Sequence, residues 1–503
     1  MDHAHSFGFS PSVPFPREGA RSFFGDGRLI NFWLLVVLTA GLLIVTADGL
    51  TKPFDNDWEF TAEVVLSHKV TPAAGAFAAI MLPLVLLYAR RARASTQEGV
   101  LLWFLLCTMT YSKDFAYLQI PGLPLYISDY VLGWLLLRQF VWPRLRWFRL
   151  RSTPVFSILV LIGIGCVAAL RGLAGGAQVV LVFRDLAMVV YGLFLIVGIV
   201  MIRDWKSIGR VLCVLVTGAI FMSVNALAWL LNTPGQRRYI VQNGAGQLVL
   251  MCLVLVLVAT LNRLVPRLVG WSACLALTLG VLLANSRALD VSLAGIIAIL
   301  VLFGPSTGHT TLRARFKAVA ASVVTGVLVL AALVQTAPGA ALVGRAAEEL
   351  VSGVVYSQDD PQAQFRLLAW AEAMARFAKN PIIGEGYGLP FTFENFEEDP
   401  RPHNTYLTFL YKTGVTGFVA LIVVLARFFL RGWTAVRTFR DMREAGLLYA
   451  LLLGLLAVFI AGNFSFVFES PYLASVVWLT MAIGYRMGWL LAVPGRLIVS
   501  GQV

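Results

Sequence analysis

Charged residues are scarce in this sequence: Asp, Glu, Lys and Arg make up 13% of its 503 residues, about half the share of about 25% that is usual in soluble domains. Hydrophobic residues make up 58%, more than a water-soluble globule of this size could bury. This balance excludes a soluble enzyme and a disordered chain. The five cysteines lie in apolar runs and form no Cys-x-x-Cys pair or Cys/His cluster. A disulfide framework, a zinc site and an iron–sulfur site therefore have no support.

Internal repeats are also lacking, which removes the usual sign of a transporter built from inverted repeats. Long apolar runs are abundant instead, and a membrane-spanning helix needs about 20 mostly apolar residues. We predict an all-α polytopic transmembrane helix bundle of about 12–14 spans, with one long extracytoplasmic loop containing short helices. The ninth and tenth candidates could instead form one long span or a broken helix. The candidate spans are 30–48, 72–90, 98–112, 121–141, 154–171, 177–202, 208–231, 244–262, 268–285, 287–304, 318–338, 404–430, 445–463 and 471–490.

The charge is unevenly distributed along this path. Lys and Arg number 40 against 27 Asp and Glu, and the excess lies in short loops that all fall on one side of the membrane. Cationic loops mark the cytoplasmic side, so both termini are expected to be cytoplasmic. No basic stripe interleaved with aromatic residues occurs outside those loops, so nucleic acid is not an expected partner. The predicted organisation is a tail (1–28), a transmembrane bundle (29–338), an extracytoplasmic loop (339–403), C-terminal spans (404–492) and a tail (493–503).

The loop 339–403 is the one long polar stretch between spans, and it falls on the outer side. Long loops carry function more often than short ones. Helical spacing of apolar residues predicts a helix near 362–379, which Pro381 and the glycines of 382–388 end. We expect this loop to cap the outer face of the bundle. The apolar stripe comprises Phe365, Leu368, Ala369, Ala373 and Phe377.

Cations also gather at the predicted outer boundary, where the positive-inside rule disfavours them. Each has an ordinary alternative: an arginine in a span could pair with a neighbouring carboxylate, as Arg184 with Asp185, and one at a helix end could snorkel to the headgroups. Arg237 and Arg238 could be ordinary interfacial residues. The argument for a site is that these arginines and one histidine are all predicted to lie at the same outer boundary. The residues are Arg184, Arg237, Arg238, Arg287, Arg366 and His403.

Arginines in a partly desolvated cleft suit a phosphate or diphosphate, because the planar guanidinium makes bidentate contacts to phosphate oxygens. A histidine with a near-neutral pKa can take a proton from a hydroxyl group. Together these residues predict group transfer from a lipid-linked diphosphate. The histidine would activate the attacking hydroxyl, and the arginines would stabilise the departing diphosphate.

The chain from about residue 175 to residue 470 resembles the O-antigen ligase and O-antigen polymerase family of bacterial envelope glycan enzymes. His403 and Asn404, followed after nine residues by Gly414 and then by Gly417, are similar to the His-Asn-x9-Gly-x-x-Gly signature of the ligase branch. Three other segments resemble the family's loop helix and Gly-x-Gly turn, its Ser-Arg segment and its cationic span. They are FRLLAWAEAMARFAKNPIIGEGYG, NSRALDVSLAG and VFRDLAMVVYGLFLI.

The resemblance implies metal-free, cofactor-free and inverting transfer of a glycan at the periplasmic face of the bacterial inner membrane. The implied partners are an undecaprenyl-diphosphate-linked donor, a lipid A–core or glycan acceptor, and membrane lipids. His403 is the implied base, and Arg184 and Arg287 are the implied diphosphate ligands. Arg366 would hold the donor, and Asn404 would orient His403 or bind sugar. Tyr406, Arg237 and Arg238 complete the expected substrate-binding set.

Three other interpretations remain. A polymerase would use the same chemistry to join two lipid-linked repeats. A metal-dependent transferase with a lipid monophosphate donor could bind its metal at Asp55 and Asp57, although a solvated acidic turn explains that pair more simply. A transporter or flippase would recognise an anionic substrate with the outer arginines and make no covalent bond.

Overall fold

The computed structural model describes residues 72–118, 125–141, 153–232, 243–284, 286–303, 361–389, 391, 401–440 and 442–492. Helices make up the regular structure of this part, and it contains no strand. Eight of its helical segments are long and apolar enough to cross a membrane. The prediction of an all-α polytopic bundle is confirmed. The candidate spans 30–48 and 318–338 lie outside the described residues.

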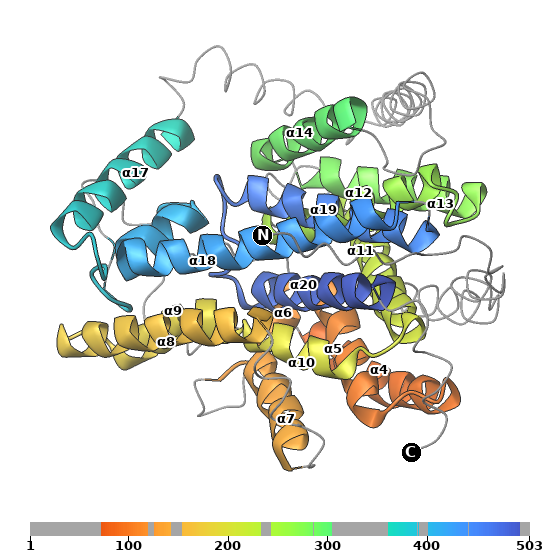
Figure 1. Cartoon of the computed structure of the whole chain (residues 1–503), viewed down its shortest axis with the longest axis horizontal. Coiled ribbons are helices and arrows are strands. Elements are labelled where there is room, and N and C mark those ends of the chain that lie inside the picture. Colours follow the sequence, from red (N-terminus) through yellow and green to blue (C-terminus); the bar gives the residue numbers. More distant parts are fainter. Residues whose placement is uncertain are drawn as a thin grey trace, which may run out of the picture.

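Figure 1 shows the helices α8, α14, α18 and α20 running in roughly the same direction across the view, with α17 at one end of them. The described helices are α4 (Pro72–Arg91), α5 (Thr96–Tyr111), α6 (Lys113–Ala116), α7 (Ile127–Val141), α8 (Thr153–Ala174), α9 (Val179–Val190), α10 (Leu193–Met201), α11 (Trp205–Asn232), α12 (Asn243–Leu261), α13 (Arg267–Leu283), α14 (Arg287–Phe303), α17 (Pro361–Lys379), α18 (Thr405–Thr438), α19 (Arg443–Ala461) and α20 (Pro471–Leu491).

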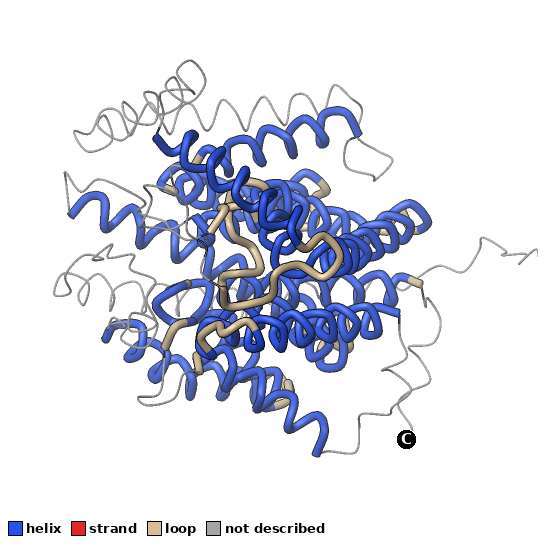
Figure 2. The backbone as a smooth tube through the Cα atoms, turned by 90° about the vertical axis from the view of Figure 1, so that its left-hand side faces the viewer, coloured by secondary structure: helices blue, strands red, loops and turns tan. Residues whose placement is uncertain are grey.

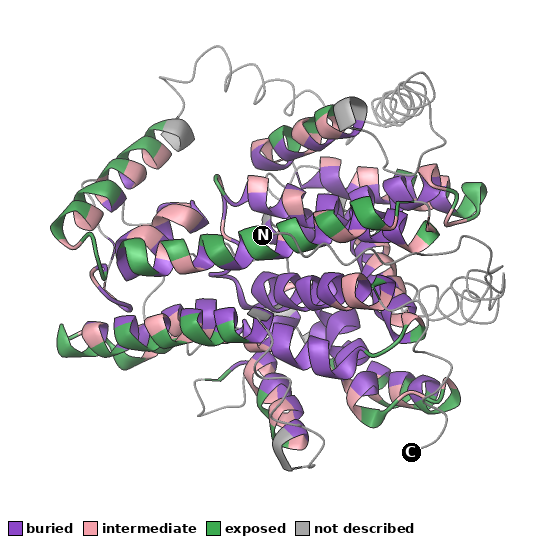
Figure 3. Cartoon of the chain, viewed as in Figure 1, coloured by how far each residue is buried: buried purple, intermediate pink, exposed green. Residues whose placement is uncertain are grey.

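The core of the bundle is formed by helices that are apolar on all sides. Helix α12 packs against α13 and α19, and nearly all of its span is buried. Helices α8 and α18 instead expose one apolar face each, as helices at the lipid boundary of a bundle do. Figure 3 shows this difference between the buried centre and the partly exposed outer helices.

One predicted span is divided in the structure, and one predicted pair of spans forms two separate helices. The segment predicted as one span over 177–202 is divided into α9 and α10 by a turn at Tyr191 and Gly192. The candidates 268–285 and 287–304 are two helices, since α13 ends at Leu283 and α14 begins at Arg287. This pair is therefore not one continuous span.

The loop helix is present as α17, which covers the end of the bundle where α18 begins (Figure 1). Its first residue is Pro361, whose fixed φ and missing N–H suit a helix start. Ala369 and Ala373 are buried against the bundle, whereas Leu368 is exposed. The buried stripe is thus narrower than predicted. Successive helical residues are rotated by about 100°, so Leu368 lies beyond the edge of the stripe that contains Ala369.

The connections at this end gather together, as the tan segments in Figure 2 show. Thr405 at the start of α18 donates its backbone N–H to the carbonyl of Gly462 (3.0 Å), which follows α19. The turn after α17 reaches the end of α8, where Tyr387 donates its N–H to the carbonyl of Ala168 (3.0 Å). Many of the basic loop residues predicted to be cytoplasmic, such as Arg203 and Arg443, lie at the other ends of their helices.

Candidate functional site

The segment that carries His403 is held between the loop helix and the connection from α19 to α20. Trp370 of α17 donates its indole N–H to the carbonyl of Pro402 (2.8 Å). The His403 ring lies between Phe365 (ring centroids 5.7 Å apart) and Phe466 (4.4 Å). The backbone of His403 has a φ of 47°, a left-handed conformation in which Asn, Asp and His are enriched. Its ring is therefore fixed by packing and by an unusual backbone turn.

Helix α18 begins directly after this turn because Asn404 caps it. The Asn404 Oδ1 accepts hydrogen bonds from the N–H groups of Tyr406 and Leu407, both at 3.0 Å, which satisfies two of the donors that a helix start leaves open. The Tyr406 hydroxyl donates to the carbonyl of Phe459 in α19 (2.8 Å). Both predicted binding residues thus have structural contacts that fix the helix that follows His403.

Gly414 interrupts α18 with φ 67° and ψ −171°, and the turn after α17 fills the interruption. A Cβ at Gly414 would clash with the carbonyl oxygen of Ile382, so the spacing from His403 to a glycine has a steric cause. Backbone groups freed by the break are bonded by the turn, which a helix at membrane depth requires. The four bonds run from Glu385 N to Tyr411 O (2.9 Å), Gly386 N to Lys412 O (3.0 Å), Val415 N to Pro381 O (2.8 Å) and Thr416 N to Ile382 O (3.2 Å).

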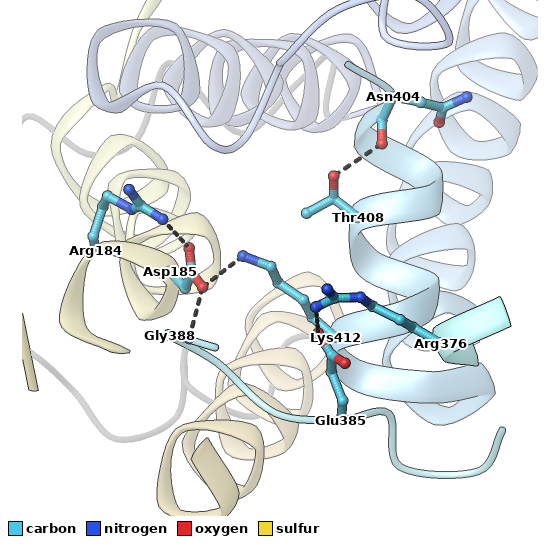
Figure 4. Close-up of polar contacts among 8 residues, drawn as sticks. All are labelled: Arg184, Asp185, Arg376, Glu385, Gly388, Asn404, Thr408 and Lys412. Carbon is cyan, nitrogen blue, oxygen red and sulfur yellow. Dashed lines mark hydrogen bonds and ion pairs between the residues drawn. The ribbon is translucent and has the colours of Figure 1, made fainter. Parts of the chain in front are cut away.

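A buried ion pair joins α9, α18 and this turn (Figure 4). The ammonium of Lys412 donates to Asp185 Oδ2 at 2.5 Å, and both side chains are almost fully buried. The same oxygen accepts the backbone N–H of Gly388 (2.8 Å). Arg184 lies 3.5 Å from the other carboxylate oxygen. One carboxylate of α9 therefore connects to two segments that lie 203 and 227 residues further along the chain.

A second ion pair holds α17 to the turn. Arg376 contacts Glu372 (2.8 Å) on its own helix and Glu385 (3.3 Å) in the turn, and its guanidinium lies 4.8 Å from the centre of the Phe391 ring. Burial raises the pKa of Glu385, and the charge of Arg376 partly offsets that rise. These contacts fix the position of α17 over the start of α18.

The cationic span and the His403 segment each carry an arginine that acts on Tyr117. Burial raises the pKa of the Tyr117 phenol, and the positive charges of Arg401 and Arg184 partly offset that rise. Arg401 in turn lies over Phe466 (4.1 Å from the ring centre), the ring that contacts His403. Arg401 therefore lies beside the ring that contacts His403, whereas Arg184 is connected to α18 through Asp185 and Lys412.

Arg287 lies at the same end of the bundle but on another helix. It begins α14, which packs against α12 and α19. Gly295, two turns later, lies beside Ile460 near the end of α19, and Leu289 lies beside Gly246 near the start of α12. Arg287 is half-buried there.

Of the other predicted residues, the structure describes Arg366. Arg366 lies half-buried in α17, next to Phe365. Arg237 and Arg238 lie outside the described residues, as do Asp55 and Asp57 of the metal-dependent alternative.

Lys412 and Glu469 are polar residues of this region that the sequence analysis did not select. Lys412 interrupts the apolar run of a span, and that alone is a signal of function or of a buried partner. Glu469 accepts hydrogen bonds from Thr405 Oγ1 (2.8 Å) and the N–H of Val467 (3.3 Å) through Oε2. Its Oε1 is buried and has no hydrogen-bond partner within the described part of the chain. A buried acceptor of this kind is costly unless a donor reaches it.

The fold and this cluster define a multi-pass membrane protein with a polar site at one end of its helices, under a loop helix. Residues 272–422 match the family model described as O-antigen ligase. This part of the chain thus matches the O-antigen ligase domain, which confirms the predicted resemblance to the O-antigen ligase and polymerase family. That family indicates a membrane enzyme of the ligase or polymerase type with lipid-linked glycan substrates. No curated protein matches the chain.

Proposed function

We propose that this protein transfers a glycan from undecaprenyl diphosphate to an acceptor, as an O-antigen ligase, at the periplasmic face of the bacterial inner membrane. The family match carries the proposal, because residues 272–422 include Arg287, Arg366 and His403. Two contacts support the same site: Arg401 lies over Phe466, the ring that contacts His403, and Arg184 is connected to α18 through Asp185 and Lys412. In this orientation both termini are cytoplasmic, since the loop helix lies on the outer side.

The proposed step is a single displacement. His403 takes the proton of the acceptor hydroxyl while that oxygen bonds to the anomeric carbon of the donor sugar. The bond from this carbon to the diphosphate oxygen breaks, and attack from the opposite face inverts the anomeric configuration. Arg184 and Arg287 stabilise the negative charge of the leaving diphosphate. Arg366, Asn404 and Tyr406, with Arg237 and Arg238, are proposed to contact the donor or its sugar.

The test is glycan transfer by the purified protein in lipid vesicles, with an undecaprenyl-diphosphate glycan donor, with and without EDTA. We expect transfer to lipid A–core that EDTA does not reduce. Longer lipid-linked glycans without a lipid A–core product would identify a polymerase. Transfer that stops with EDTA would direct attention to Asp55 and Asp57. Movement of the donor across the vesicle membrane without any covalent product would support the transporter and contradict the proposal.

Replacing Arg184 or Arg287 by lysine keeps the positive charge but removes the planar fork that binds two phosphate oxygens. We expect either variant to lose transfer by about tenfold or more, since one charge-assisted hydrogen bond contributes about 1.5–3 kcal/mol. Arg427→Lys is a matched control, because Arg427 bonds Ser157 (2.8 Å) far from the site. Transfer rates of Arg184→Lys and Arg287→Lys equal to that of the control would exclude bidentate diphosphate binding.

A further inference from the structure

The loop helix α17 has an outward face whose composition is unusual for a helix in a water-exposed loop. The helix is outside the segments that are apolar enough to span the membrane. Its inward face packs on the bundle through Ala369 and Ala373, and its charged residues between Phe365 and Phe377 are half-buried. The outward face is therefore made by the remaining residues alone.

Between positions 367 and 378 these outward residues are all apolar, and the exposed polar residues Gln364 and Lys379 lie on either side of that stretch. Leu367 is 63% exposed, Leu368 50% and Met374 45%, and the other exposed residues from position 367 to position 378 are alanines. A helix side that faces water normally carries charged or polar residues. An uninterrupted apolar face instead marks an interaction surface.

The same apolar surface continues into a helix that crosses the membrane. In the turn after α17, Ile382 is 68% exposed and Ile383 46% exposed. The backbone of this turn is hydrogen-bonded to α18 beside Val415, and both Val415 and Val419 are exposed on that helix. Because α18 is a membrane-spanning segment, its exposed apolar side chains face lipid.

We propose that the outward face of α17 contacts the acyl chains of the bilayer, so that the loop helix lies in the membrane surface rather than as a cap in water. The continuity with α18 identifies lipid as the occupant, and an interfacial helix with one apolar face is the form that such binding takes. Trp370 and Phe365 connect this helix to Pro402 and His403. Anchoring α17 would therefore fix the His403 segment at the depth of the lipid headgroups.

The proposal is independent of the glycan-transfer function and can be tested without turnover. The full chain carries a fluorescent probe on Met374→Cys, in a Cys166→Ala background because Cys166 is an exposed cysteine. The protein is placed in phosphatidylcholine vesicles that contain doxyl-labelled lipid, and iodide is the aqueous quencher. We expect strong quenching by 5-doxyl lipid and an iodide quenching constant several-fold below that of a probe in water.

Two reference positions calibrate the result. Val419→Cys on the exposed face of α18 should report lipid, and Arg440→Cys in the turn after α18 should report water. Leu367→Cys repeats the measurement at a second position on α17. Iodide quenching at both α17 positions equal to that of Arg440→Cys would overturn the proposal. Weak quenching by both agents would also overturn it, because protein such as a second copy of the chain would then cover the face.

Discussion

Glycan transfer by the His403→Asn protein is expected to fall by about 10²–10⁴-fold, the usual contribution of a general acid–base group. Asparagine is the better replacement because His403 has a φ of 47°, and asparagine tolerates the left-handed region whereas alanine is strained there. The amide of asparagine can still form hydrogen bonds but cannot take a proton at neutral pH. Loss of transfer would then report the missing base rather than a distorted turn. The measurement is the initial rate of product formation in vesicles.

Two further variants complete this test. His403→Ala should lose transfer to the same extent, and Thr434→Ala, which removes an exposed hydroxyl from the far end of α18, should keep it. Donor binding and the thermal unfolding temperature of His403→Asn should stay close to those of the unchanged protein. A variant that still transfers glycan at more than about one tenth of the normal rate would exclude His403 as the base.

The Asp185→Asn protein is expected to lose about 3–5 kcal/mol of unfolding free energy, the cost of removing one partner from a buried ion pair. Asp185 accepts hydrogen bonds from Lys412 and Gly388, and the substitution leaves the buried ammonium of Lys412 without that carboxylate. The double variant Asp185→Asn with Lys412→Met should recover part of the loss, since no buried charge then remains at either position. Unfolding in detergent micelles, followed for both single variants and the double variant, measures the coupling.

Glu372→Gln is the matched control for this cycle. It breaks the pair with Arg376 within one helix, where Glu372 is partly exposed, and such pairs contribute about 0.2–0.5 kcal/mol. A coupling energy between Asp185 and Lys412 below about 0.5 kcal/mol would mean that the two sites act independently. The pair would then not hold α9 to α18.

Much of the architecture follows from residue patterns that act locally. Each span must satisfy its own backbone hydrogen bonds and be apolar along its length, so its position can be predicted without knowledge of its neighbours. The loop helix was predictable for a similar reason, since Pro361, Pro381 and the apolar spacing between them lie within one segment. The family signature from His403 to Gly417 is also contiguous in sequence, and the family match confirms the resemblance.

The contacts between segments required the tertiary structure. Nothing in the sequence near Asp185 shows that its partner is Lys412 rather than the adjacent Arg184, because the choice depends on how α9 and α18 pack. Apolar helices in lipid give no hydrophobic pattern that specifies their neighbours, and small residues and buried polar groups decide the packing instead.

The sequence by itself therefore determined the class of protein, most of the described spans and the set of cations expected on the outer side. Only the tertiary structure showed that the glycine turn 384–388 closes the break in α18 at Gly414 and that His403 is packed against Phe365 and Phe466. The physical reason is that hydropathy is a property of one segment, whereas a site is made by side chains from several segments whose distances are set by packing.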